Sequence, residues 1–310
     1  MAPSAPALIP RAQLAELNTL RDGPAARRLL AHLGLIAAGG LLWGQQPLPL
    51  PLRLAGLVAC GVGLATSFAG LHECSHRTAF RNRRLNDGVA WLLGLFSFYN
   101  ATAYRRYHQW HHRYTHQPGL DPELDDPVPT SLATYLLELS GATWWTGKLR
   151  GHARLLWGDL SSVPYLSGQV IPQVRRSAWL QASLYLLLAV LSLIGSNGFL
   201  LWFWLLPLAL GQPLLRFLLL AEHSGCSFST DGTANTRTTR TNPVVRWLMW
   251  NMPFHAEHHL YPSLPFHSLP AAHQLIGPQL EHLDHGYLGV HRRLLANLPA
   301  LALPAGGAAA

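Results

Sequence analysis

The sequence predicts an all-α membrane protein, with two transmembrane helical hairpins (about four spans) and a helical cap on the cytoplasmic side. Three observations lead to this fold class. Charged residues make up 12% of the 310 residues, about half of the roughly 25% found in soluble domains. Hydrophobic residues reach 49%, yet the mean hydropathy is only +0.14, so a substantial part of the chain belongs in water. The apolar residues gather in a few long segments.

These segments occupy residues 29–43, 52–71, 178–194 and 199–221. A bilayer core about 30 Å thick requires about 20 helical residues, so the first segment is short for a span. The connections at residues 44–51 and 195–198 are brief, which predicts one hairpin from each pair. A further apolar run at residues 89–98 is too short to span and is expected in the membrane interface or the cap.

The placement of arginine sets the predicted orientation. Residues 195–198 carry no charge and Arg53 is the only charge near the other turn, whereas the opposite ends hold Arg27, Arg28, Arg77, Arg81, Arg83, Arg84, Arg175, Arg176 and Arg237. The positive-inside rule therefore places both termini and the long connection in the cytoplasm. We expect a cytoplasmic N-terminal segment (1–27), a membrane domain (28–300) and a disordered Ala/Gly-rich tail (301–310). Lys148 is the only lysine, and almost all of the positive charge comes from arginine. Such a bias often reflects a GC-rich genome, so we expect a bacterial inner-membrane protein.

Composition also excludes several classes of function. The net charge is +8, but the arginines flank apolar runs, which fits anionic lipid headgroups better than nucleic acid. The three cysteines (Cys60, Cys74 and Cys226) form no CxxC pair. This sparse, odd set argues against a disulfide framework and against a thiolate zinc site.

Histidine is the unusual residue, with 17 copies, and it is clustered. The second apolar segment ends in LHECSH and the fourth in AEHSG, and the motifs YHQWHH and FHAEHH lie in the polar parts of the chain. Together they supply nine candidate metal ligands: His72, His76, His108, His111, His112, His223, His255, His258 and His259. All nine fall on the predicted cytoplasmic side, although histidine was not used to derive the orientation.

The spacing within the motifs indicates metal binding. Residues at i, i+3 and i+4 share one face of a helix, so HxxxH presents two imidazoles, and the adjacent histidines of HxxHH diverge enough to reach separate ions. Nine ligands exceed what one ion takes, so we expect two ions. Imidazole suits Fe, Zn, Cu and Ni. Glu73, Glu222 and Glu257 each adjoin a cluster histidine and are candidates for accepting the other ring N–H.

The motifs HECSH, HQWHH and HAEHH, with His223 after the second hairpin, resemble the membrane fatty acid desaturase family of histidine-box di-iron desaturases and hydroxylases. The resemblance covers residues 52–269 and points to a bacterial branch. It implies that the cap holds a di-iron site with the nine histidines as ligands. It also implies O2 as co-substrate and stepwise hydrogen abstraction from a lipid or acyl chain in a kinked apolar tunnel, giving an alkene. No haem-binding His-Pro-Gly-Gly stretch and no iron–sulfur cysteine set occurs, so a separate ferredoxin or rubredoxin-type protein is expected to supply electrons.

Other interpretations remain open at this stage. The same chemistry extends to a hydroxylase or monooxygenase acting on a lipid or a smaller molecule. HECSH also matches the HExxH zinc-protease signature, in which Glu73 would activate a zinc-bound water. A protein that only stores metal is a third class. Residues 121–126 are expected to form a solvated loop, and Tyr99 and Trp144 to line a tunnel or anchor the interface. Six histidines outside the motifs lack their spacing and are interpreted as ordinary: His116, His152, His267, His273, His282 and His285.

Overall fold

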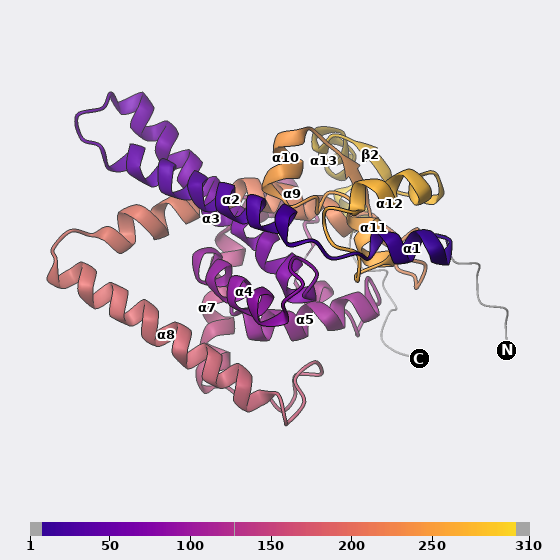
Figure 1. Cartoon of the computed structure of the whole chain (residues 1–310), viewed down its shortest axis with the longest axis horizontal. Helices are drawn as coiled ribbons and strands as arrows, with labels where there is room; N and C mark the ends of the chain where they lie inside the picture. The colour runs from indigo at the N-terminus through magenta and orange to yellow at the C-terminus, as the bar shows by residue number, and fades with distance from the viewer. Residues whose placement is uncertain (1–7, 127, 302–310) are drawn as a thin grey trace.

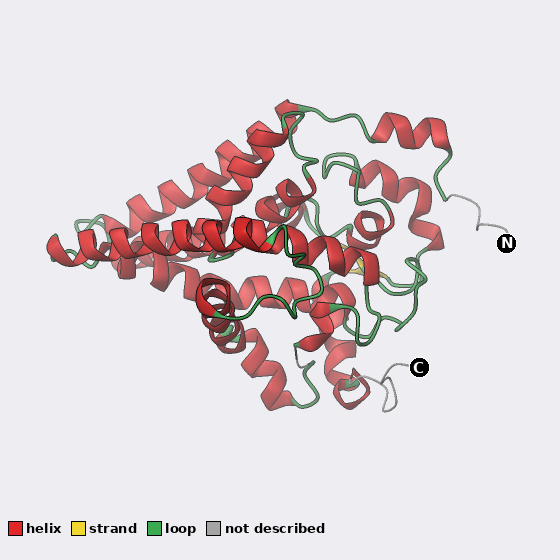
Figure 2. Ribbon diagram, turned by 90° about the horizontal axis from the view of Figure 1, so that it is seen from below, coloured by secondary structure: helices red, strands yellow, loops and turns green. Residues whose placement is uncertain are grey.

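The computed structural model describes residues 8–126 and 128–301 and is mostly helical (Figures 1 and 2). Four long apolar helices are present: α2 (Asp22–Gly44), α3 (Leu50–His76), α8 (Ile171–Ile194), and a π-helical turn (Leu201–Leu205) that continues into α9 (Leu206–His223). Each has the length and hydropathy of a membrane span, which confirms the predicted fold class. The predicted disordered tail lies outside the described residues apart from Leu301.

The first span is longer than its apolar run suggested. Helix α2 has 23 residues, enough to cross a bilayer core of about 30 Å. It begins at Asp22, in the polar stretch before the apolar segment, because helical hydrogen bonding does not stop where hydropathy falls. A separate short helix, α1 (Arg11–Leu17), also lies within the predicted N-terminal segment.

Helix α3 is the centre of the membrane part. Some 72% of its apolar window is buried, compared with 17% for α2, 11% for α8 and 33% for α9. Small residues allow this burial: at Gly61 and Gly211 the backbones of α3 and α9 approach so closely that an added Cβ would overlap the facing backbone. The outer faces expose large apolar side chains such as Leu186 and Leu193, as expected for helices surrounded by lipid.

The remaining elements form the polar end of the molecule. After the first hairpin come α4 (Arg83–Ser97), α5 (Ala101–Tyr114), a 3-10 turn η1 (Pro122–Asp125), α6 (Leu132–Leu139) and α7 (Ala142–Trp157). After the second come β1 (Thr238–Arg240), α10 (Pro243–Leu248), α11 (His255–Leu260), α12 (Leu269–Ile276), η3 (Gly277–Gln279), β2 (Leu283–His285), α13 (Tyr287–Ala296) and η4 (Leu298–Leu301).

The two strands pair in parallel, with Thr238 opposite Leu283. The apolar run at residues 89–98 falls in α4, which packs against α3 and has only 15 residues, in agreement with its predicted place outside the spans. In Figure 1 the turns of both hairpins lie at the left, and α11, α12 and α13 gather at the right. Histidines at the ends of α3 and α9 therefore meet those of α5 and α11.

Candidate metal centre

Four helices bring the nine predicted histidines together. His72 and His76 lie in the last turns of α3, and His223 is the last residue of α9. Helix α5 carries the second motif, and the preceding Asn100 caps it, since its side chain accepts from the backbone N–H of Ala103. Helix α11 begins at His255 and carries the third motif.

The ring nitrogens form two adjacent groups. In the first, ligand atoms lying within 4.8 Å of one another come from His72, His76, His108, His112 and His258. In the second they come from His111, His223 and His259. His255 adjoins the second group, because its Nε2 lies 3.2 Å from Nε2 of His223. The adjacent residues His111 and His112 fall in different groups, as do His258 and His259, which is the divergence that the HxxHH spacing predicted.

The distances within the groups fit a shared metal ion. Nε2 of His112 lies 3.0 Å from Nε2 of His108 and 3.1 Å from Nε2 of His258. Imidazole nitrogens bound to one ion at about 2.1 Å lie roughly 3.0–3.4 Å apart, depending on the coordination geometry. The buried ring nitrogens of the cluster that have no hydrogen-bond partner among the described residues include Nε2 of His72, His76 and His259. Buried polar atoms are rarely left unpaired unless a ligand satisfies them.

Burial also holds these rings neutral. It lowers the pKa of His258 to about 3 and the pKa values of His108, His112, His255 and His259 well below the ordinary value, and the neighbouring histidines lower them further. A neutral imidazole is the form that binds a metal. The cluster is therefore in the protonation state that coordination requires.

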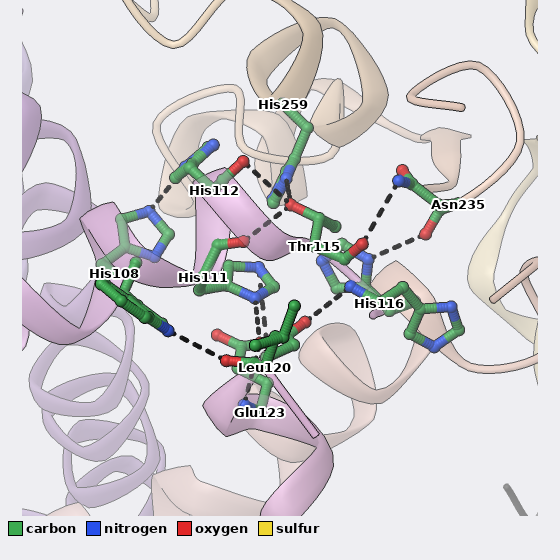
Figure 3. A network of polar contacts seen from close by, with 12 residues as sticks. His108, His111, His112, Thr115, His116, Leu120, Glu123, Asn235 and His259 are labelled. Atoms are coloured by element: carbon green, nitrogen blue, oxygen red, sulfur yellow. Dashed lines mark hydrogen bonds and ion pairs between the residues drawn. The ribbon is translucent and has the colours of Figure 1, made fainter. Parts of the chain in front are cut away.

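His111 differs, because a buried carboxylate holds it. Its Nδ1 lies 2.9 Å from Oδ1 of Asp121, and both side chains are 1% exposed. Burial alone would lower the pKa of His111, but Glu123 and Asp121 together raise it. Figure 3 shows His111 directed at the loop that carries Leu120 and Glu123. The predicted solvated loop is thus correct at the exposed Asp125 and wrong at Asp121.

The other members of the second group are oriented in the same way. Nδ1 of His259 lies 3.0 Å from the hydroxyl of Thr115, which donates its own hydrogen to the carbonyl of His111 (Figure 3). Nδ1 of His223 lies 3.2 Å from the carbonyl oxygen of Asn235. Each of these contacts fixes the Nδ1–H tautomer and leaves Nε2 for a metal. Thr115, Asn235 and Asp121 were not predicted as part of the site, because none of them lies in a recognisable sequence motif.

The three predicted glutamates have different surroundings. Glu73 accepts from the Thr78 hydroxyl at 2.6 Å and from the backbone N–H of Phe266 at 3.1 Å. Glu257 accepts from the Thr238 hydroxyl and from His273. Neither carboxylate contacts a cluster histidine among the described residues, because successive residues of a helix point about 100° apart.

Glu222 is the exception, since its Oε2 lies 3.4 Å from Nε2 of His255. It therefore faces the metal side of that ring and is a candidate carboxylate ligand. Glu73, in contrast, is committed to Thr78 and Phe266. It is not placed to activate a water on His72 and His76, which disfavours the zinc-protease interpretation.

Arg237 stabilises the C-terminal end of α9 by binding its last carbonyl groups. Arg237 is buried, donates to the carbonyl oxygens of Ala221 (2.6 Å) and Ser224 (2.8 Å), and pairs with Asp284 at 2.9 Å. A cation that bonds the last carbonyls of a helix is favourable there. From the sequence, Arg237 was expected only to be one of the arginines that set the cytoplasmic orientation.

A cavity of about 640 Å³ opens on the cluster. It is lined by five of the nine histidines, which are His72, His108, His111, His223 and His255. Part of its wall is apolar, including Phe68, Tyr104 and Leu219, and part is charged. The volume lies within the usual range of small-molecule sites.

Comparison with known proteins agrees with this geometry. Residues 49–290, more than three quarters of the chain, match the fatty acid desaturase family model. A sn-1 oleoyl-lipid 12-desaturase of Synechocystis is 25% identical over 79% of this chain and 73% of its own length. A Delta(5) fatty acid desaturase of Caenorhabditis elegans is 26% identical over 66% of this chain, which spans about half (53%) of that relative. A dihydrorhizobitoxine desaturase of Bradyrhizobium elkanii is 28% identical over 73% of this chain and 67% of its own length. The chain belongs to the fatty acid desaturase family.

Proposed function

We propose that the protein is a non-haem di-iron oxidoreductase that uses O2 to introduce a double bond into a fatty acyl chain. The observation that carries the proposal is the pair of adjacent imidazole groups in a chain that matches this family. In the net reaction two C–H bonds break, and one C=C bond forms. The substrate gives up two electrons and two protons, an external donor supplies two electrons, and the solvent supplies two protons, so that O2 is reduced to two water molecules.

The residues divide this work between them. The two groups of histidines would each hold one iron, and bound iron supplies the capacity to activate O2 and attack an unactivated C–H bond. Asp121, Thr115 and the carbonyl of Asn235 orient the rings of the second group. Glu222 lies close enough to add an oxygen ligand beside His255. The cavity, which is lined by histidines of both groups, would hold the substrate.

We further propose a bacterial inner-membrane location, with the metal centre and both termini in the cytoplasm. Four apolar helices support the membrane location, and the arginines at the ends opposite the hairpin turns support this orientation. The electrons would come from a separate ferredoxin or rubredoxin-type protein. Residues 28–300 would form one catalytic domain, preceded by a cytoplasmic segment.

Metal content and product analysis of the purified protein test the proposal. We expect roughly two iron ions per chain, since nine imidazoles exceed the four to six ligands of one ion. A His111→Ala variant should lose about half or more of the iron, and His285→Ala, an exposed histidine outside the cluster, should lose none. Mass spectrometry of lipids from expressing cells should show products lighter by two hydrogens. About one zinc and no iron would overturn the proposal, and products heavier by one oxygen would replace desaturation with hydroxylation.

A further inference from the structure

The charged part of the cavity wall includes two half-buried cations that form no ion pair among the described residues. Lys148 of α7 and Arg216 of α9 both line the cavity. No ion pair within 4.0 Å joins either of them to a carboxylate in the part of the chain that the structure describes. Nε and Nη2 of Arg216 are buried and have no hydrogen-bond partner among those residues. A buried, unpaired donor is costly unless a ligand completes it.

Aromatic rings position both cations. Nζ of Lys148 lies 3.5 Å from the centroid of the Tyr99 ring, and the Arg216 guanidinium carbon lies 5.9 Å from the Trp144 ring. The indole N–H of Trp144 donates to the Tyr99 hydroxyl at 3.0 Å, which joins the two rings into one support. Cation–π contacts of this kind orient a cation and leave its N–H groups available to a ligand.

The carboxylates of the cavity are largely engaged elsewhere. Asp121 holds His111, Glu222 faces His255, and Glu138 accepts from the hydroxyl of Thr143 at 2.5 Å. Asp126 is exposed to solvent. Glu123 also lines the cavity, with its Oε2 3.7 Å from Nε2 of His111. Because none of these carboxylates forms an ion pair with Lys148 or Arg216 among the described residues, both cations are available to an oxyanion, with which Arg makes two parallel hydrogen bonds.

Arg216 also lies within a membrane-spanning helix, in an otherwise apolar run from Pro213 to Ala221. An ionisable side chain in such a helix is rare and generally faces a functional cavity. Arg216 precedes His223 by seven residues, so the helix rise places their Cα atoms about 10 Å apart. Both residues line the same cavity, which leaves room for several carbon atoms between an anion at Arg216 and the histidines.

We infer that the substrate ends in an anionic head group, a carboxylate or a phosphate monoester, that Lys148 and Arg216 bind inside the cavity. The apolar body of the substrate then lies along Phe68, Tyr104 and Leu219 towards the histidines. The inference rests on the proposed function in one respect, which is that this cavity receives the substrate. It specifies an amphiphile with a free acidic end rather than an ester-linked chain of a membrane lipid.

Equilibrium binding without turnover tests this inference. The ferrous full-length protein, held anaerobically in lipid nanodiscs, is dialysed against octanoate, octyl phosphate or octan-1-ol, and the alcohol corrects for partition into lipid. We expect at least one of the two anions to bind about tenfold or more tightly than the alcohol. Whichever anion binds more tightly identifies the head group. Equal affinity for the anions and the alcohol would overturn the inference, and this comparison needs only the unaltered protein.

Charge-neutral variants provide the second arm. Lys148→Gln and Arg216→Gln should each weaken binding of the preferred anion about tenfold and leave the alcohol unaffected, whereas Arg150→Gln, on the exposed face of α7, should change neither. Equal losses for anion and alcohol would refute the assignment. Iron content and product formation are measured separately. Selective anion binding without O2-dependent product would refute the proposed function alone, and product formation without anion selectivity would refute this inference alone.

Discussion

Asp121 is the residue whose removal should separate metal binding from the rest of the fold. Its Oδ1 faces Nδ1 of His111 at 2.9 Å and accepts from the backbone N–H of Glu123 at 3.0 Å. Its Oδ2 accepts from the backbone N–H of His116 at 2.7 Å. Every neighbour is therefore a donor. In Asp121→Asn either orientation of the amide turns its NH2 group towards one of these donors. The hydrogen bond that orients the His111 ring is therefore weakened or lost.

The magnitude follows from the position of the carboxylate beside a metal-ligating ring. Loss of such an outer hydrogen bond costs about 10–100-fold in metal affinity, or about 1.4–2.7 kcal/mol. Because both side chains are 1% exposed, solvent does not screen the interaction. We therefore expect iron bound to the second histidine group to be released at a chelator concentration roughly ten- to a hundredfold lower than in the unaltered protein.

The assay is iron occupancy against increasing concentrations of a ferrous chelator. Asp125→Asn provides the matched control, since Asp125 lies in the same turn and is exposed. Thermal unfolding of the apoprotein, measured in parallel, reports any loss of stability that does not involve metal. If Asp121→Asn retains its iron within about twofold of the control, the carboxylate does not position His111 and the reasoning fails.

Three further predictions follow from the structure. Gly61→Leu should lower the melting temperature by several degrees or prevent folding, because overpacking a close helix contact costs about 1–3 kcal/mol or more, whereas Gly88→Ala, with open space around its Cα, should be neutral or stabilising. Thr115→Val should weaken iron binding about tenfold by removing the partner of His259 Nδ1. An iron affinity that stays within about twofold of the unaltered protein would be the opposing result. The apoprotein should lose stability as pH falls from about 6.5 towards 3: His258 has a folded pKa of about 3, so in this window the unfolded chain binds more protons than the folded one. A melting temperature that stays constant between pH 7 and pH 5 would contradict that sign.

Patterns local in the sequence predicted the spans and the histidine motifs well. Hydropathy located all four helices, and the HxxHH spacing anticipated that His111 and His112 reach different groups. Successive residues of a helix point about 100° apart, so the same periodicity gave no reason to expect Glu73 and Glu257 to contact the histidines next to them.

Sequence patterns could not predict contacts between residues that are far apart in the chain. A short Asp- and Pro-rich stretch is typical of a solvated loop, and only packing of the loop beneath α5 buries Asp121. Lys148 and Arg216 are 68 residues apart in the sequence. Nothing in either helix indicates that they share a cavity wall, so the charged pocket could be found only in the folded chain.

One packing contact explains why His72 of α3 and His223 of α9 lie at the same level along the two helices. Helices α3 and α9 are the second helices of their hairpins, so both run from an outer turn towards the metal centre. They touch at Gly61 and Gly211. His72 follows Gly61 by 11 residues and His223 follows Gly211 by 12 residues, which correspond to rises of about 16.5 and 18 Å.

The two histidines therefore emerge within about one residue of the same level, although they belong to different hairpins. A helix that slid by one turn would shift His223 by about 5.4 Å relative to His72, more than the 4.8 Å that encloses each group of ligand atoms. The glycine contact thus sets the register on which both metal groups depend. For this reason an enlarged side chain at Gly61 should disturb iron binding as well as stability, even though it lies about 16 Å below the nearest ligand.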